Sequence, residues 1–274
     1  MSRRNKEIVS SSIEVSAAQK DFIRRHMVLK RKIRIYQLII LIGFIATWEV
    51  TTRLGIVNSF VFSSPARVCK SIFEMMISGQ LFYHAGITLV ETIVSFFLVN
   101  FFGILIAVIL WWNDSVSKVL EPYLIVLNSL PKSALAPVFI VWLGNNMKTI
   151  IVAAVSVAVF GTIINLYSDF ESVEEDKIKL IQTLGGKKKH VLLKVIIPSN
   201  IPSIISQMKV NIGLSLVGVI IGEFLAAKAG LGYLIIYGSQ VFKLDWVIMS
   251  IVILCIVATG LYKILAYFEK KYTR

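Results

Sequence analysis

Residues 87–112 read ITLVETIVSFFLVNFFGILIAVILWW and carry one charged residue, Glu91. A helix needs about 20 mainly apolar residues to cross the hydrocarbon core of a bilayer, because it must satisfy its own backbone hydrogen bonds where water is absent. This stretch exceeds that length and therefore predicts a transmembrane helix.

The composition of the whole chain also indicates a membrane protein. Of the 274 residues, 56% are hydrophobic and 16% are charged, and the mean hydropathy is +0.76. A soluble domain has roughly a quarter of its residues charged. The net charge of +13 could indicate a nucleic-acid binder, but the Lys and Arg residues lie between long apolar runs, which favours an orientation signal and no nucleic-acid partner.

Five more apolar runs approach the length of a membrane crossing. They are residues 35–52, 119–143, 150–167, 204–227 and 247–267. Pro131 and Pro137 interrupt the run 119–143, and several glycines dilute the run 204–227. We expect an all-α polytopic membrane protein with about six transmembrane helices, a single membrane domain over residues 35–268, a basic N-terminal segment 1–34 and a short tail 269–274.

The distribution of Lys and Arg predicts the orientation of these crossings. Six crossings place both termini on one side, and that side holds ten Lys or Arg before residue 35 and seven more over residues 177–209. The opposite loops hold only six. Cytoplasmic loops carry the excess of positive charge, so both termini are expected to be cytoplasmic. The N-terminal segment lacks a signal-peptide pattern, and its residues 17–34 fit either a helix along the inner leaflet or a solvated basic tail.

Residues 172–198 predict a helix, a turn and a second helix. Ser172 can cap the first helix, with Glu174 and Glu175 in its opening turn, where the helix dipole favours acidic side chains. The expected apolar face of the first helix consists of Ile178, Ile181 and Leu184, and Gly185 and Gly186 form the break after it. The expected apolar face of the second helix consists of Val191, Leu192 and Val195, and Pro198 ends that helix. Such a hairpin could seat in a groove of another protein, or it could be a basic loop lying on lipid headgroups.

The run TLGGKKKHVLLKVIIP at 183–198 resembles the coupling loop of importer-type ABC permeases. That loop has an EAA triplet, three residues, Gly, nine residues, Ile, one residue and Leu-Pro. The matching positions after the triplet are Gly185, Val195, Ile197 and Pro198, with the spacing intact. The triplet positions hold Lys179, Leu180 and Ile181, which is a departure from the pattern.

Three more segments resemble the nitrate, sulfonate and taurine branch of these permeases, whose membrane domain is of the MetI-like, binding-protein-dependent type. They read SSPARV at 63–68, NSLPKSALAPVFIVWLG at 128–144 and GEFLAAKAGLGYLI at 222–235. The resemblance covers residues 35–268. Glu91 departs from the many relatives that carry a basic residue at that place.

The resemblance implies a transport subunit, without enzymatic activity, in the cytoplasmic membrane of a bacterium. Its implied partners are cytosolic ABC ATPase subunits, an extracytoplasmic substrate-binding protein and a second copy of this chain. The ATPase would bind ATP and Mg²⁺, since the chain has no GxxxxGK[ST] loop. The implied cargo is a small anion such as nitrate, a sulfonate or taurine, or else a vitamin precursor. An ion-gradient-driven carrier or channel is the alternative.

No catalytic set and no metal-ligand spacing is found in the sequence, and the three histidines, His26, His84 and His190, lie far apart. Candidates for the translocation path come from helix breakers and charges within the crossings, which are costly there. They are Pro131, Lys132, Pro137, Gly222 and Glu223. Lys132 could meet an anionic substrate or pair with a carboxylate. Glu223 could instead anchor the segment that ends in Gly230-Leu-Gly232, and the glycines could serve helix packing alone.

Overall fold

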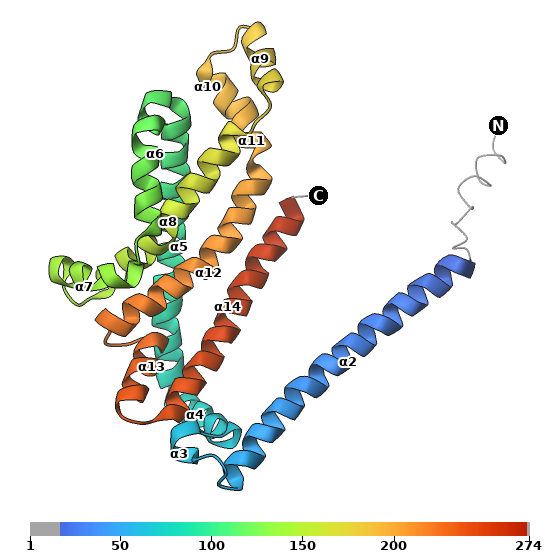
Figure 1. The fold of residues 1–274 in the computed structure, drawn as a ribbon, viewed down its shortest axis with the longest axis vertical. Coiled ribbons are helices and arrows are strands. Elements are labelled where there is room, and N and C mark those ends of the chain that lie inside the picture. Colours follow the sequence, from blue (N-terminus) through green and yellow to red (C-terminus); the bar gives the residue numbers. More distant parts are fainter. Residues whose placement is uncertain (1–16, 273–274) are drawn as a thin grey trace. The chain divides into compact units, whose positions relative to one another are not determined.

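The computed structural model describes residues 17–272 of the chain, and side chains at 26 and 28–269 (Figure 1). All regular elements in this part are helical. They are α2 Ala17–Arg53, α3 Ser59–Phe62, α4 Pro65–Ile77, α5 Gln80–Trp112, α6 Asp114–Ser129, α7 Lys132–Leu143, α8 Met147–Glu171, α9 Glu175–Thr183, α10 Lys188–Val191, the π-helical turn η1 Leu192–Ile196, α11 Ile197–Ser199, α12 Ile201–Ala226, α13 Leu231–Gln240 and α14 Leu244–Tyr272.

The described chain falls into two compact units, one ending at Pro65 and the other beginning at Ala66. The expected division at residues 34 and 268 therefore stays a prediction. The first unit contains α2, which runs without a break from Ala17 to Arg53. The basic stretch 17–34 is thus the start of the same helix as the first apolar run, because no proline interrupts residues 17–53. Residues 1–16 and 273–274 of the expected terminal segments lie outside the described residues.

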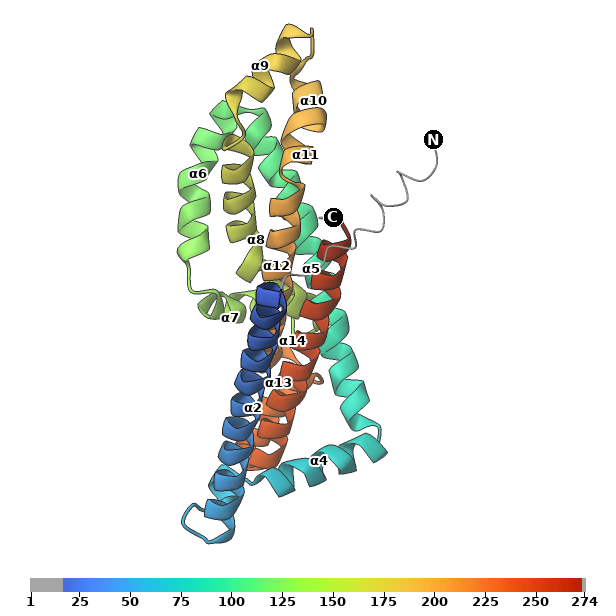
Figure 2. The same ribbon diagram turned by 90° about the vertical axis from the view of Figure 1, so that its right-hand side faces the viewer.

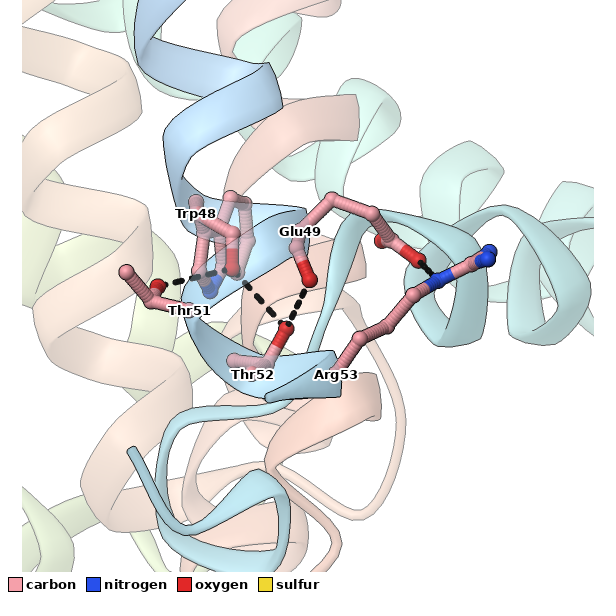
Figure 3. A network of polar contacts seen from close by, with 5 residues as sticks. All are labelled: Trp48, Glu49, Thr51, Thr52 and Arg53. Carbon is pink, nitrogen blue, oxygen red and sulfur yellow. Dashed lines mark hydrogen bonds and ion pairs between the residues drawn. The ribbon is translucent and has the colours of Figure 1, made fainter. Parts of the chain in front are cut away.

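Side-chain hydroxyls close the last turn of α2 (Figure 3). Thr52 donates to the carbonyl oxygens of Trp48 and Glu49 at 2.8 and 2.9 Å, and Thr51 donates to Trp48 at 3.1 Å. Arg53 pairs with the Glu49 carboxylate at 2.6 Å. A carboxylate one turn before an arginine is a favourable arrangement on a helix. Glu49 thus finds its counter-charge on its own helix.

The second unit is built on α5, α8 and α12, which lie side by side (Figures 1 and 2). Helices α6 and α7 flank α8, and α13 and α14 pack on each other and on α12. The hairpin of α9 and α10 extends beyond one end of these helices, and α4 and α13 lie toward the other end (Figure 1). Arg67 of α4 and Asp245 of α14 form an ion pair at 2.9 Å, which joins two segments far apart in sequence.

Five helices of the described chain are long and apolar enough to cross a membrane, and the pair α6 and α7 makes a sixth if it counts as one span. This agrees with about six predicted crossings. The third one differs from expectation, because the chain bends by 96° between α6 and α7. Pro131 lies at this bend, whereas Pro137 lies inside α7 without ending it. The predicted crossings are also shorter than the helices, since apolar length marks only the part that lipid would surround.

Glycines allow α12 to approach its neighbours closely. A Cβ atom on Gly218 would lie 2.6 Å from the Cα atom of Ala154 on α8, and one on Gly222 would lie 3.0 Å from the Cα atom of Ile150. Helices in lipid gain much of their association from such close packing, because apolar burial offers little there. Gly222 is therefore a packing contact between α12 and α8, and its part in a translocation path stays a prediction.

A buried network of polar side chains joins the same three helices. The amide of Asn211 on α12 donates to Asn100 on α5 at 2.9 Å, and its oxygen accepts from Thr162 on α8 at 2.9 Å. Gln207 donates to the same oxygen at 3.0 Å. Each partner would otherwise be an unsatisfied polar group in an apolar setting, so the network specifies one packing of α5, α8 and α12.

Replacing Gly218 with valine is expected to destabilise the contact between α8 and α12, because the new side chain would overlap backbone atoms. Overpacking of this kind costs about 1–3 kcal/mol. Thermal unfolding of the purified chain in detergent measures the effect. Gly213→Val is the matched control on the same helix, since a Cβ atom at Gly213 meets nothing within 4 Å. Equal melting temperatures for the two variants would contradict the close approach.

Candidate functional site

The hairpin that resembles a coupling loop is closed by two consecutive glycines. Gly185 adopts a left-handed conformation with φ of +79°, and its amide donates to Gln182 at 2.9 Å. The amide of Gly186 donates to Ile181 at 2.8 Å. These two bonds form a Schellman motif, which ends a helix by satisfying its last carbonyl groups. A glycine is required at the left-handed position, because a side chain there meets its own backbone.

The hairpin packs back onto the bundle through its apolar residues. A buried cluster at its base combines residues of α5 and α8 with the second limb of the hairpin, and its members are Ala107, Leu166, Phe170, Val191, Leu192 and Ile196. Ile178, Ile181 and Ile197 pack against this cluster. Val195 is also buried, so the predicted apolar face of the second limb points inward.

The outward face of α9 differs from the predicted one. Ile178 and Ile181 are half-buried against the cluster, whereas Leu184 is 77% exposed and Leu180 is 60% exposed. The predicted stripe of Ile178, Ile181 and Leu184 therefore divides between an inner and an outer side. The exposed leucines, not the isoleucines, are available to a partner.

Two details of the predicted hairpin are wrong. Ser172 ends α8, because its hydroxyl donates to the carbonyl oxygen of Asp169 at 2.8 Å, while Glu174 occupies the position before α9. Pro198 does not end the second limb, which continues to Ser199. The wider π-helical turn over Leu192–Ile196 precedes the proline, and its bond spacing relieves the clash that a proline makes in an α-helix.

Charged side chains hold both limbs in place. Lys188 of α10 lies 3.6 Å from the carboxylate of Asp114 and 5.4 Å from the ring centroid of Trp111, at the corner between α5 and α6. On α9, the hydrogen bond from Lys179 lowers the pKa of the exposed Glu175 carboxyl. The turn is therefore fastened to the bundle at its base and stiffened along α9.

The bend between α6 and α7 is held by Lys132. The ammonium group donates to the carbonyl oxygens of Leu127, Asn128 and Leu130, at 2.9 Å for Asn128 and 3.0 Å for Leu130. These groups lie at the end of α6, where the helix leaves carbonyls without intrahelical partners. The ammonium also lies 5.6 Å from the ring centroid of Phe160. Lys132 thus serves as a cap at the broken span, and its part in a translocation path stays a prediction.

Glu223 lies at the centre of a buried polar cluster near the end of α12. Its carboxylate accepts from the hydroxyl of Thr88 at 2.6 Å and from the backbone of Gly232 at 2.5 Å. The Thr88 oxygen accepts from the backbone of Leu231 at 2.8 Å, and His84 accepts from the backbone of Gly230 at 3.0 Å. The structure therefore confirms that Glu223 anchors the segment ending Gly230-Leu-Gly232.

A cavity of about 490 Å³ lies beside this cluster, between α5, the start of α8 and the loop after α12. Glu91 contributes to its lining and is 2% exposed. A volume of this size is typical of sites for small ligands. Gly222 and Glu223 lie next to this region on α12 but do not line the cavity.

The residues that form the cluster were mostly missed from the sequence. His84, Thr88 and Glu91 recur at helical spacing along the first quoted apolar run and the turn before it. Such a polar stripe on a transmembrane helix indicates a face turned toward protein. It would have indicated which face of α5 is turned toward protein, although it would have located neither Glu223 nor the loop that shares the cluster.

Replacing Thr88 with valine is expected to destabilise the chain by about 1–3 kcal/mol, because it removes the hydroxyl that donates to Glu223 Oε1 and accepts from the Leu231 amide. The measurement is thermal unfolding in detergent, followed by circular dichroism. Thr92→Val is the matched control: Thr92 is equally buried, and its hydroxyl bonds only within α5, to Thr88. A loss that is equal in both variants would contradict the anchoring role.

Comparison with known proteins agrees with these features. Residues 99–273 match the family described as binding-protein-dependent transport system inner membrane component. An aliphatic sulfonates transport permease protein of Bacillus subtilis is 27% identical over 78% of this chain and 77% of its own length. A formylaminopyrimidine transport permease protein of Halalkalibacterium halodurans is 28% identical over 68% of this chain and 74% of its own length.

A solved structure has the same fold. A subunit of the MetNI methionine ABC transporter, in an inward facing conformation, superposes with a TM-score of 0.62 and is 16% identical in sequence. The superposition covers 72% of this chain and 98% of the subunit. The family match spans more than half of the chain and includes α8, α12 and the hairpin of α9 and α10. This chain therefore belongs to the binding-protein-dependent transport system inner membrane components, the multi-pass inner-membrane permease subunits of ABC importers, which work with a separate ATPase and a substrate-binding protein.

Proposed function

We propose that two copies of this chain form the membrane pathway of an importer for a small organic solute, and that the α9 and α10 hairpin docks on the ATPase. The observation that carries this proposal is the construction of the hairpin. It extends from the bundle, is closed by the Gly185 turn, and packs its inner face on α5 and α8 while Leu180 and Leu184 face outward. A rigid element of this kind can transmit a displacement to the helices beneath it.

The proposed orientation places both termini and the hairpin on the cytoplasmic side. The support is the excess of Lys and Arg in the N-terminal stretch and across residues 177–209. In this orientation the cavity beside Glu91 lies toward the extracytoplasmic side, because α5 begins at the end of the bundle away from the hairpin (Figure 1). Cargo delivered by a binding protein would then reach this cavity first.

ATP and Mg²⁺ are proposed to bind to the ATPase alone. The sequence has no GxxxxGK[ST] loop to cradle nucleotide phosphates. Transport would follow alternating access, in which rigid groups of helices rock around the pathway. The span is broken at Pro131 and Lys132, and Pro137 lies in the helix that follows, so these three residues remain candidates for the translocation path.

The proposed cargo is a small solute, as in the relatives whose names specify aliphatic sulfonates and formylaminopyrimidine. The cavity of about 490 Å³ accommodates molecules of this size. An ion-gradient-driven carrier is disfavoured, because the family works with an ATPase.

Replacing Leu184 with aspartate is expected to weaken docking, because it places a charge on the outward apolar face of α9. We expect at least a roughly tenfold loss of the ATPase subunit that copurifies with the chain, which corresponds to about 1.4 kcal/mol. Leu54→Asp is the control, since Leu54 is 69% exposed and lies outside the hairpin. Full retention of the ATPase by Leu184→Asp would contradict the docking surface.

Replacing Gly185 with valine is expected to uncouple ATP hydrolysis from uptake, because a β-branched residue strains the left-handed turn by about 1–3 kcal/mol. The measurement is the ratio of solute uptake to ATP hydrolysed in proteoliposomes that contain the whole importer. Gly79→Val is a matched control: its φ is +72°, and, as at Gly185, nothing lies within 4 Å of an added Cβ atom. An unchanged ratio in Gly185→Val would overturn the role of the turn.

A further inference from the structure

The cavity beside Glu91 combines apolar walls with few polar groups. Its walls come from α5, the start of α8 and the loop after α12, and include Ile87, Val90 and Ile150. Among its polar residues, Asn146 is engaged, because its oxygen accepts from the first amides of α8 and its nitrogen donates to Leu143 at 2.7 Å. Asn145 and Lys228 are exposed at its edge.

Glu91 is the buried polar group of this cavity. The residue is 2% exposed, and its Oε2 atom has no hydrogen-bond partner in the described part of the chain. Buried polar atoms are nearly always paired, and leaving one unpaired is costly. Because Glu91 also lines the cavity, this unpaired acceptor points to a donor supplied from outside the chain.

The neighbouring carboxyl group does not meet this need. The carboxylate of Glu223 already accepts hydrogen bonds from the Thr88 hydroxyl and the Gly232 amide, within the polar cluster beside the cavity. The side chain of Glu91 also contacts Glu223 through a hydrogen bond. The Oε2 atom of Glu91 therefore stays without a hydrogen-bond partner in the described part of the chain.

We propose that the cavity binds the transported solute through an N–H group, an amino or ammonium group, that donates to Glu91 while the rest of a small solute packs on the apolar walls. This proposal rests on the proposed function and specifies its substrate class. A solute that presents only oxygen anions to Glu91 is disfavoured, because the anion would lie beside two buried carboxyl groups, those of Glu91 and Glu223. An anionic group on the same solute has Lys228 at the cavity edge as its counter-charge.

The test uses two pairs of probes that differ in the N–H group. The pairs are 4-aminopyrimidine with 4-methylpyrimidine, and taurine with 1-propanesulfonate, in which a methyl group takes the place of the amine. Binding to the full-length chain in lipid nanodiscs, without ATPase, is measured by calorimetry. We expect the amino member of at least one pair to bind about tenfold more tightly than its methyl counterpart, the effect of one hydrogen bond to a buried acceptor.

Three variants test which group is responsible. Glu91→Leu is expected to abolish the preference for the amino probe, whereas Glu91→Gln is expected to keep it, because the amide retains an acceptor oxygen. Glu121→Leu is the control, since Glu121 lines a different cavity. Gly86→Leu provides an independent test: Gly86 lines the cavity and an added Cβ atom there meets nothing within 4 Å, so a leucine should occupy the cavity and abolish binding of the amino probe.

Equal affinities within both pairs, absence of binding by either amino probe, or a preference that survives in Glu91→Leu would overturn the proposal. Elution of each variant as the wild-type species in size-exclusion chromatography shows that it is folded. If Glu91→Leu does not fold, Gly86→Leu and Glu91→Gln decide the question. Failure here is distinguishable from failure of the importer assignment, because copurification of the ATPase is measured separately and does not depend on Glu91.

Discussion

Glu223 belongs to α12, and its carboxylate accepts hydrogen bonds from Thr88 on α5 and from Gly232 on α13. In an apolar surrounding a charged or polar group must be paired within the protein, so this one side chain fixes how three segments meet. Gly230 and Gly232 must be small, because a Cβ atom at Gly232 would lie 2.7 Å from the same carboxylate. The cavity beside Glu91 exists because the loop after α12 is held there.

The same requirement explains the breaks in the helices. Each end of a helix leaves backbone groups without partners, and water is not available to satisfy them in a bilayer. Lys132 satisfies the carbonyl groups at the end of α6 within the apolar bundle. At the end of α9, in the hairpin that extends beyond the bundle, two glycine amides do the same. The sequence leaves Lys132 open between a contact with an anionic substrate and a pair with a carboxylate; in the structure its ammonium group donates to backbone carbonyl groups. The proline and the lysine act together as a stable bend.

The hairpin of α9 and α10 was predicted only in part from its sequence motif. The positions of the turn and of the inward face of the second limb were predicted, because glycines and apolar periodicity are local signals. The face of α9 that meets a partner was not, because Ile178 and Leu184 are equally apolar. Packing on α5 and α8 buries the isoleucine, and only the rest of the bundle decides this. The predicted end at Pro198 was also wrong, because a π-helical turn precedes the proline and the limb continues to Ser199.

The sequence by itself determined the number of crossings, the all-α class and the location of the coupling hairpin, because apolar length, charge placement and glycine spacing act over short stretches of chain. The importer family also followed from local motifs such as the segment at 222–235. Only the tertiary structure decided that Glu223 anchors a loop, that Gly218 and Gly222 are contact points and that Glu91 faces a cavity. These properties depend on which distant residue lies opposite each side chain, and no local pattern encodes that pairing.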